Sequence, residues 1–339
     1  MEHLRNVLVA IYISCSILII KANLFIIGAI LYSPVLRKKT RNHIIISIAL
    51  ADLLLGSFVT PMLATNLIES SIADCHTHLA VQVIGDHGIF FVVGWELVTF
   101  NILHLRESNM RFPWNFLKVP VSACLKSFIL TIWPWFAALC ILVPLIVTNA
   151  PIKLYYNLSD DAMCMMRLPR NILVTVCFFS LYLPFYLCVA ALVTVVVCYS
   201  KGCHKRSSTT LMDSPRNDAI EEAPQRLEVE QQVDRPDNPL VACVPNMVYL
   251  VCYMPLIVHT WLHFSNIYTP NAAYGMIVFG LLARSIILPL SWAVFKDIRH
   301  ELKEYEKKLK NVLGACVRNP LPSTSSAVSF SRLQETQTV

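Results

Sequence analysis

Residues 42–62 read NHIIISIALADLLLGSFVTPM, and this stretch decides what kind of fold the chain can adopt. It is apolar enough to cross a membrane as a helix, yet a carboxylate, Asp52, stands near its middle. A charged side chain at the centre of a bilayer costs roughly 2.5–3.5 kcal/mol on insertion scales, so it rarely occurs there without a partner. Ionisable groups also lie deep inside three other apolar stretches: Lys21, Asp86, His87, Glu96, His104 and Arg284. We therefore interpret the chain as an all-α bundle of apolar helices closed around a few polar side chains.

The composition is that of an integral membrane protein with one domain. Of the 339 residues, 55% are hydrophobic and only 15% are charged, and the mean hydropathy is +0.56. A soluble domain carries about 25% charged residues. The net charge of +6 does not indicate a nucleic-acid partner, because Lys and Arg cluster beside the apolar stretches, as in cytoplasmic flanks. The twelve cysteines show neither metal-ligand spacing nor a CxxC pair, so no metal or other cofactor is predicted.

Seven transmembrane spans are predicted, and together they form a bundle over residues 7–295. Their approximate bounds are 7–32, 43–68, 81–105, 127–147, 171–199, 239–264 and 272–295. The first apolar stretch is too long for the core of a cleavable signal peptide. Basic residues follow the first, third and fifth spans, which places residues 1–6 outside and the chain end inside. We expect a multi-pass protein of the plasma membrane that contacts the lipid bilayer.

The segments outside the bundle differ in composition. Residues 207–238 are rich in Glu, Asp, Gln, Ser and Pro, which predicts a disordered third cytoplasmic loop. Residues 296–316 are predicted to form an amphipathic helix on the inner membrane surface, and residues 317–339 a disordered tail. The apolar stripe of that helix comprises Phe295, Ile298, Leu302, Tyr305, Leu309 and Val312.

Two sites of covalent modification are candidates. Cys316 continues the apolar stripe and is either a site of acylation or a free cytoplasmic thiol. Asn157, in the triplet Asn157-Leu158-Ser159, is a glycosylation acceptor in a loop that the charge rule places outside.

Several residues stand along the spans in the order of a known family's landmarks. They are Asn23 in the first span, Asp52 at the end of IALAD in the second, a tryptophan of WPW (133–135) in the fourth, Pro184 in the fifth, VCYMP (251–255) in the sixth and LPLSW (288–292) in the seventh. Arg106 precedes Pro113 by seven residues, as the family's third-helix arginine precedes its loop proline. In this order the chain resembles the rhodopsin-like (class A) G-protein-coupled receptors over nearly its whole length.

The resemblance implies a receptor that binds a small extracellular or lipid-borne ligand between its outer helix ends. Ligand binding would move helix six about Pro255 and open a cleft for a heterotrimeric G protein. The short N-terminal segment and SIALADLLLGSFVTPM (47–62) are similar to amine and adenosine receptors, but Thr260 and Leu282 stand where adenosine receptors carry ligand-binding Asn and His. The candidate ligand-binding residues are Asp86, His87, Glu96, Tyr253, His259, Thr260 and Trp261.

The resemblance also implies the residues that transmit the signal. The predicted polar switch comprises Asn23, Asp52, Arg284, Pro255, Pro289 and Trp292, and Arg106 and Glu107 are the predicted transducer contacts. Cys75 and Cys164 are the cysteines of the outer loops, and we expect a disulfide between them.

The departures from the family's pattern define an alternative. No acid precedes Arg106, Tyr253 replaces a tryptophan, and Leu288 and Trp292 replace the Asn and Tyr of the seventh-helix motif. These changes leave open a receptor-fold protein with a silent, constitutive or partner-regulating role.

The register of the third span is a second open question. Asp86 misses the amine-anchoring position by two residues when counted back from Arg106, and two residues rotate a helix by about 200°. The spacing from Cys75 to Arg106 also exceeds the family's usual one. Either the third span contains an insertion near its outer end, or one of these two anchors is misassigned.

Asp52 and Arg284 carry the sharpest structural prediction. In the family, the helix-two aspartate holds a sodium ion beside polar groups of helix seven. Arg284 lies five residues before Pro289, on the stretch that would face that pocket, so its guanidinium would replace the ion and pair with the carboxylate. In the alternative, Arg284 turns elsewhere, for example to Glu96, and Asp52 is hydrated. Lys21 is two residues from Asn23 and should therefore point away from the bundle.

Other classes of membrane protein fit less well. A retinal protein needs a lysine in the seventh span, and 272–295 contains none. We find neither the inverted repeats nor the matching broken helices of a transporter. No HExxH, GxSxG or nucleophile–base pair indicates an intramembrane enzyme, so we do not expect catalysis.

Overall fold

The apolar stretches form helices because a segment in hydrocarbon must satisfy its own backbone hydrogen bonds. The computed structural model describes residues 2–68, 83–107, 123–148, 152–155, 162–165, 169–200, 239–267 and 271–318. Within these ranges, seven helices are long and apolar enough to cross a membrane: Arg5–Tyr32, Thr40–Thr65, His87–Arg106, Phe128–Val147, Arg170–Ser200, Leu240–Phe264 and Gly275–Val294. The predicted all-α seven-span fold with a further C-terminal helix is confirmed.

The elements follow one another along the chain as a series of long helices, three of which contain a π-helical turn. In order they are α1 (Glu2–Tyr32), α2 (Pro34–Arg37), α3 (Thr40–Leu54), η1 (Leu55–Val59), α4 (Thr60–Ile68), η2 (Ile84–Ile89), α6 (Phe90–Glu107), α7 (Ala123–Thr148), β1 (Ile152–Tyr155), β2 (Ala162–Met165), α8 (Arg170–Cys177), η4 (Phe178–Tyr182), α9 (Leu183–Ser200), η5 (Pro239–Ala242), α11 (Cys243–Phe264), α12 (Asn271–Ser291), η6 (Trp292–Val294) and α13 (Lys296–Arg318).

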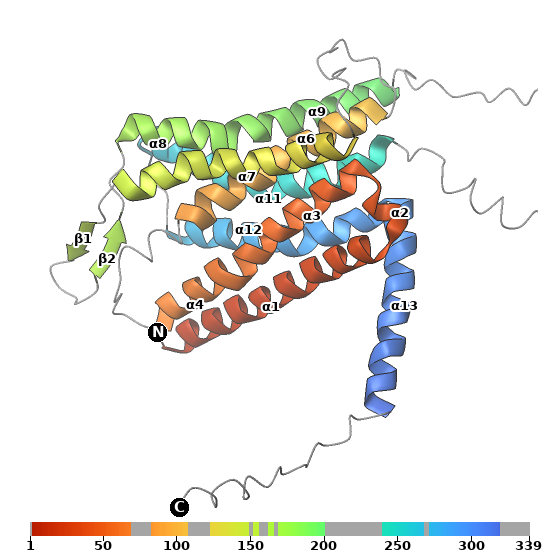
Figure 1. Ribbon diagram of the computed structural model, residues 1–339. Helices are drawn as coiled ribbons and strands as arrows, with labels where there is room; N and C mark the ends of the chain where they lie inside the picture. The colour runs from red at the N-terminus through yellow and green to blue at the C-terminus, as the bar shows by residue number, and fades with distance from the viewer. Residues whose placement is uncertain are drawn as a thin grey trace, which may run out of the picture.

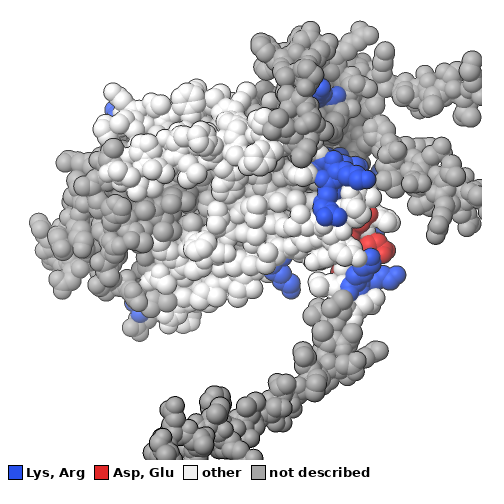
Figure 2. Space-filling model, in the orientation of Figure 1, with Lys and Arg blue, Asp and Glu red and all other residues white. Residues whose placement is uncertain are grey.

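The long helices run side by side, and the two ends of the bundle differ (Figure 1). The start of α1 and the β1–β2 hairpin lie at one end, which we call the hairpin end. The short helix α2 and the start of α13 lie at the other, which we call the α13 end. Helix α13 runs across the direction of the bundle instead of along it. Lys and Arg gather at the α13 end, while the visible flank of the bundle carries little charge (Figure 2).

Several predicted boundaries need correction. Helix α1 begins at Glu2, so residues 2–6 are helical instead of forming a separate N-terminal segment. Helix α13 continues to Arg318, two residues beyond the predicted end. The stretch between the fourth and fifth spans contains an antiparallel hairpin, with Ile152 opposite Met165, where the sequence indicated only a loop. Residues 207–238 and 319–339 lie outside the described residues, so their predicted disorder stays a prediction.

Three of the spans contain one wide π-helical turn each, and these turns are neighbours. The turn η2 contacts both η1 and η4. In η1, the hydroxyl of Thr60 donates to the carbonyl of Leu55 at 2.9 Å. Gly56 lies close to α1: a Cβ there would be 2.9 Å from the side chain of Ile19. The carbonyl of Gly56 also accepts a hydrogen bond from Ser16 at 2.6 Å.

The turn η2 bears on the register of the third span. A π-helical turn adds about one residue to a helix. Residues beyond the turn therefore face a different direction from the one that regular α-helical spacing predicts. Asp86 lies within η2, but one added residue is only half of the two residues by which Asp86 misses the amine-anchoring position. The helix that follows, α6, is enclosed by α3, α7 and α9. The polar residues Glu96, Asn101 and His104 of α6 are therefore buried against other helices.

The amphipathic helix α13 packs on the bundle through the predicted stripe. Phe295 and Ile298 are fully buried, and Leu302 packs against the core. The Tyr305 ring contacts Phe25 of α1, with ring centroids 5.5 Å apart, and its hydroxyl lies under Gly28, where a Cβ would be only 2.6 Å away. The stripe is therefore confirmed as the buried face of the helix in its first half.

A salt bridge fixes the start of α13. The carboxylate of Asp297 accepts hydrogen bonds from Arg41 and, at 3.0 Å, from Lys39. Burial raises the pKa of the Asp297 carboxyl, but the positive charges of Arg41 and Lys39 outweigh it, so the net pKa lies below the ordinary value of 3.8. The carboxylate is therefore charged at neutral pH and ties α13 to the start of α3.

Candidate functional site

The centre of the candidate site is the ion pair of Asp52 in α3 and Arg284 in α12. Both side chains are 0% exposed, and Nη2 of Arg284 donates to Oδ1 of Asp52. The same nitrogen donates to the Ser285 hydroxyl at 2.7 Å, and that hydroxyl donates to Oδ1 of Asp52 at 2.9 Å. The direct ion pair predicted from the sequence is confirmed. The alternative prediction, in which Arg284 pairs with Glu96, is wrong.

Helix α1 joins this cluster through Asn23, which is also fully buried. Its amide nitrogen donates to the carbonyl of Ser285 at 3.1 Å and to the carbonyl of Ile19 at 2.9 Å. The residue after Arg284 is thus held by α1 as well as by α3. Lys21, two residues before Asn23, is exposed on the opposite side of α1, as predicted.

Aromatic rings of α11 cover the cluster. The Arg284 guanidinium carbon lies 5.7 Å from the centroid of the Tyr253 ring, close enough for a cation–π contact. The Tyr253 ring in turn packs against the Tyr249 ring, with centroids 4.3 Å apart and the planes tilted by 35°, and meets Phe90 edge-on at 5.6 Å. Tyr253, which replaces a tryptophan in the resemblance, therefore links helix α11 to the ion pair.

The pairing uses only part of the hydrogen-bonding capacity of these groups. Oδ2 of Asp52, Nε and Nη1 of Arg284 and Oδ1 of Asn23 form no hydrogen bond with any described residue. Desolvated charges are stabilised by their partners, and removing one partner of a buried ion pair typically costs about 3–5 kcal/mol. The members of the cluster therefore depend on one another, and the cluster retains donors and acceptors that no described residue uses.

Glu96 belongs to a different cluster. It is 0% exposed at the interface of α6 with α3 and α7. Its Oε1 accepts a hydrogen bond from the Ser47 hydroxyl at 2.6 Å. The Trp135 indole donates to the same hydroxyl at 2.8 Å. No ion pair joins Glu96 to a described residue, so this predicted ligand-binding residue is a structural contact between three helices in the present arrangement.

The remaining predicted ligand residues do not line one described cavity. The Asp86 side chain lies outside the described residues, and His87 is half-buried in η2. The Thr260 hydroxyl is hydrogen-bonded to the Tyr182 hydroxyl at 2.9 Å. Trp261 is 61% exposed on the outer surface of α11.

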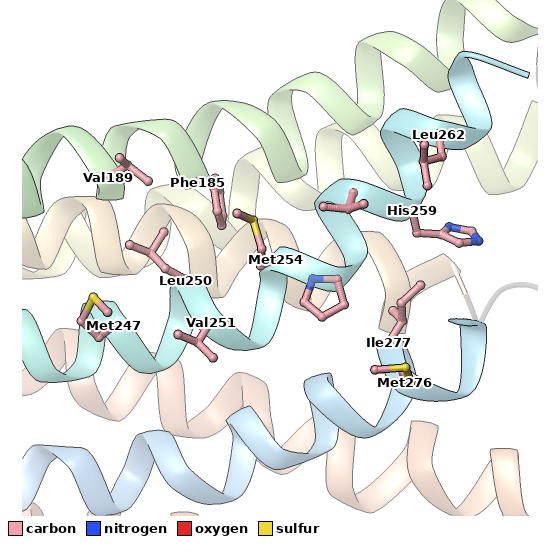
Figure 3. Close-up of a pocket in the computed structure, with 12 residues that line it drawn as sticks. Phe185, Val189, Met247, Leu250, Val251, Met254, His259, Leu262, Met276 and Ile277 are labelled. Carbon is pink, nitrogen blue, oxygen red and sulfur yellow. The ribbon is translucent and has the colours of Figure 1, made fainter. Parts of the chain in front are cut away.

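His259 lies at the end of an apolar groove on the outer side of α11 (Figure 3). The groove has a volume of about 660 Å³. Phe185 and Val189 of α9 border one side, and Met276 and Ile277 of α12 border the other. Along α11 the lining includes Met254 and Pro255, the predicted hinge. Because Met254 and its neighbours Val251 and Val258 are exposed, the groove opens toward the surrounding lipid.

Sequence reasoning missed a buried amide pair between α6 and α11. Nδ2 of Asn101 donates to Oδ1 of Asn246 at 2.8 Å, and Nδ2 of Asn246 donates back to Oδ1 of Asn101. Both side chains are buried. Asparagine side chains in apolar spans often join helices by hydrogen bonds. The presence of Asn101 and Asn246 in two apolar stretches could therefore have indicated the pair.

Trp292 lies near the α13 end of the bundle and packs among aromatic rings. It is 1% exposed, with its ring 5.0 Å from Phe100 and 6.2 Å from Phe295. Pro289, one turn before it, is also buried. Trp292 therefore packs as an apolar wedge where the resemblance has a tyrosine hydroxyl.

Other predicted site residues are placed only in part. Arg106 is exposed at the end of α6, and the side chain of the adjacent Glu107 is outside the described residues. Cys75 and Asn157 also lie outside them, so the disulfide and the glycosylation site stay predictions. Cys164 belongs to β2 and Cys316 to α13, in both cases without a described side chain.

No protein-family model matches the chain, and no curated protein sequence matches it. The geometry therefore supports a membrane protein of seven helices without assigning it to a family.

Proposed function

We propose that this protein is a receptor of the rhodopsin-like type, with the hairpin end outside the cell and the α13 end in the cytoplasm. The observation that carries the proposal is the buried cluster of Asn23, Asp52 and Arg284. The resemblance selects Asn23 and Asp52 as landmarks from two separate spans, and they meet at the seventh helix, as a receptor's central switch requires. Lys and Arg at the α13 end support the orientation, because basic residues favour the cytoplasmic side.

A ligand that enters from the bilayer suits the groove along α11 better than a charged, water-borne one. The lining is almost wholly apolar, and it includes Pro255, about which α11 would bend. A lipid-like molecule seated there would press directly on this hinge. A small amine or nucleoside bound between the outer helix ends is the second ligand class that the proposal accommodates.

Helix α11 is the element that would carry the signal. It is joined to α6 by the Asn101–Asn246 pair and to α12 by the contact of Tyr253 with Arg284. A shift of α11 changes both contacts together, so ligand binding at the groove would alter the ion pair and the α13 end of α11. A heterotrimeric G protein at that end is the proposed transducer, with Arg106 and Glu107 as contacts. We propose no catalytic role.

The test is a G-protein activation assay with the full-length chain across the four main Gα classes, using panels of amines, nucleosides and single-chain lipids. A lipid should activate at least one class. Met254→Trp, which fills the groove, should abolish the response, and Leu139→Trp, at an exposed position of α7, should preserve it. A chain that activates no class with any panel, despite reaching the plasma membrane, would contradict the receptor function.

Sodium provides a second test. Because the Arg284 guanidinium takes the position of the cation beside Asp52, ligand affinity should not change when sodium replaces potassium. Arg284→Ala should restore a sodium effect by leaving the carboxylate free for an ion. Sodium dependence in the unmodified protein would argue against this arrangement.

One observation favours the alternative of a silent or constitutively active protein. Trp292 is packed between Phe100 and Phe295 and has no hydroxyl to exchange hydrogen bonds as helices move. In that case the chain would show a fixed G-protein activity, or none, that no ligand panel changes. Trp292→Tyr would then be expected to create a ligand response, which the receptor proposal does not require.

A further inference from the structure

Lys21 places a positive charge on the outer surface of α1. It is exposed, while Asn23 is fully buried in the bundle. Lys21 is the basic residue of the apolar part of α1, which follows Arg5. If the helix crosses a bilayer, this ammonium faces lipid.

The depth of Lys21 makes escape to water difficult. It follows Arg5 by 16 residues and precedes Tyr32 by 11, which is about 24 Å and about 16 Å along a helix. Side chains in a helix point toward its N-terminus, so that of Lys21 points away from the nearer end. One turn toward that end, the Phe25 ring packs against Tyr305 of α13. The end of α1 at Arg5 is therefore too far for the Lys21 side chain to reach. Toward the end at Tyr32, the Phe25–Tyr305 contact obstructs it.

No described residue supplies a counter-charge to Lys21. Lys21 forms no ion pair or hydrogen bond with any described residue. The two carboxylates buried in the described spans are elsewhere: Asp52 is paired with Arg284, and Glu96 faces Ser47. A lipid-facing cation without a partner is costly, which indicates that its partner comes from outside the chain.

The surface around Lys21 suits a second helix. An exposed apolar stripe on α1 extends over several turns to both sides of it: Ile13, Ile17, Leu18, Leu24 and Leu31. Toward the N-terminus the exposed residues include Ala10 and Ser14, one turn apart. Small residues at this spacing let two helices approach closely. The Ser14 hydroxyl already donates to the Ala10 carbonyl at 2.7 Å and needs no further partner.

We propose that this face of α1 docks a transmembrane helix of a partner protein that carries an aspartate or glutamate near the middle of its span. The carboxylate would pair with Lys21 while apolar side chains pack along the stripe. A second copy of this chain does not fit, because it would oppose Lys21 to Lys21 and its described intramembrane carboxylates are buried. Lipid phosphates lie at the headgroup level, and the Lys21 side chain points away from the nearer end of the helix; the experiment below separates this source of negative charge from a partner helix. The inference is independent of the proposed receptor function.

The experiment uses the full-length chain in phosphatidylcholine vesicles with a designed leucine-rich transmembrane peptide that carries either Asp or Leu at its centre. Energy transfer between labels on chain and peptide measures association. We expect the Asp peptide to associate at least tenfold more strongly than the Leu peptide. Lys21→Leu should abolish the difference and Lys21→Arg should preserve it. The matched control Lys303→Leu, which removes an exposed basic residue of α13, should leave it unchanged.

Three outcomes would overturn the proposal. The first is equal association of the two peptides with the unmodified chain. The second is a preference for the Asp peptide that survives in Lys21→Leu. The third is a preference that a small fraction of anionic lipid abolishes, since this would assign Lys21 to lipid phosphates. Circular dichroism of each variant distinguishes lost association from lost folding.

Discussion

Two carboxyl groups in the membrane-spanning part of the molecule, Asp52 and Glu96, are equally buried but have opposite surroundings. Asp52 accepts hydrogen bonds from a guanidinium and a hydroxyl, whereas Glu96 accepts one from a hydroxyl alone. An ionised carboxylate far from water needs a cation, and without one the group takes up a proton. Two equally buried acids therefore need not carry the same charge. We expect Asp52 to be ionised beside Arg284, and Glu96, which has no basic partner among the described residues, to be protonated.

Removing the cation beside Asp52 should have the largest effect. Arg284→Ala leaves a buried carboxylate without a counter-ion and should lower the free energy of unfolding by about 3–5 kcal/mol. The double variant Asp52→Leu, Arg284→Met should be neutral or more stable, because it removes both desolvated charges. Thermal unfolding in detergent measures both. If the single and double variants lose equal stability, the charges are not coupled and the comparison fails.

The buried amide pair extends the comparison to neutral groups. Asn246→Leu leaves the Asn101 amide without its partner and should cost about 1–3 kcal/mol. Asn101→Leu combined with Asn246→Leu should cost less than the sum of the single changes. A double-mutant cycle on the same unfolding measurement gives the coupling energy, and a value near zero would exclude the pair as a link between α6 and α11.

Asp297 is a third carboxylate, paired with cations but outside the spans. Its lowered pKa means that the folded state binds a proton less readily than the unfolded chain. The stability it contributes is therefore present above the ordinary pKa of 3.8 and is lost as the pH falls below it. We expect Asp297→Asn to cost about 1 kcal/mol at pH 7 and to remove this acid-dependent loss. Hydrogen exchange at the start of α13 should follow the same pH dependence, and an unchanged pH profile would contradict it.

Glu96 should give the smallest effect. A neutral acid and an amide have nearly the same shape, so Glu96→Gln should change stability by about 0.5 kcal/mol or less. The infrared spectrum should contain a carbonyl band of a protonated carboxylic acid that Glu96→Gln removes and Asp52→Asn leaves in place. If Asp52→Asn removes the band, the charge states of the two acids are the reverse of those inferred above.

The sequence predicted the spans and the ion pair because both follow from the high cost of polar groups in lipid. Seven long apolar stretches can only cross a bilayer as helices. Few acidic residues lie within these stretches, so Arg284 had few possible partners. The partners of Glu96 were not predictable, because Ser47 and Trp135 are common in apolar helices and carry no distinctive pattern. The Asn101–Asn246 pair depends on the relative rotation of two helices, which the sequence does not express. The predicted ligand residues depend on the register of α6 and α11, and among those with described side chains only His259 lines the groove.

The wide turns η1, η2 and η4 have a consequence for any attempt to match this chain to other seven-helix proteins. Each adds about one residue, which corresponds to roughly 100° of rotation for everything on the far side of it. Compared with regular α-helices aligned from the α13 end, these three spans therefore present different residues to the bundle interior and to lipid beyond each turn, on the side of the hairpin.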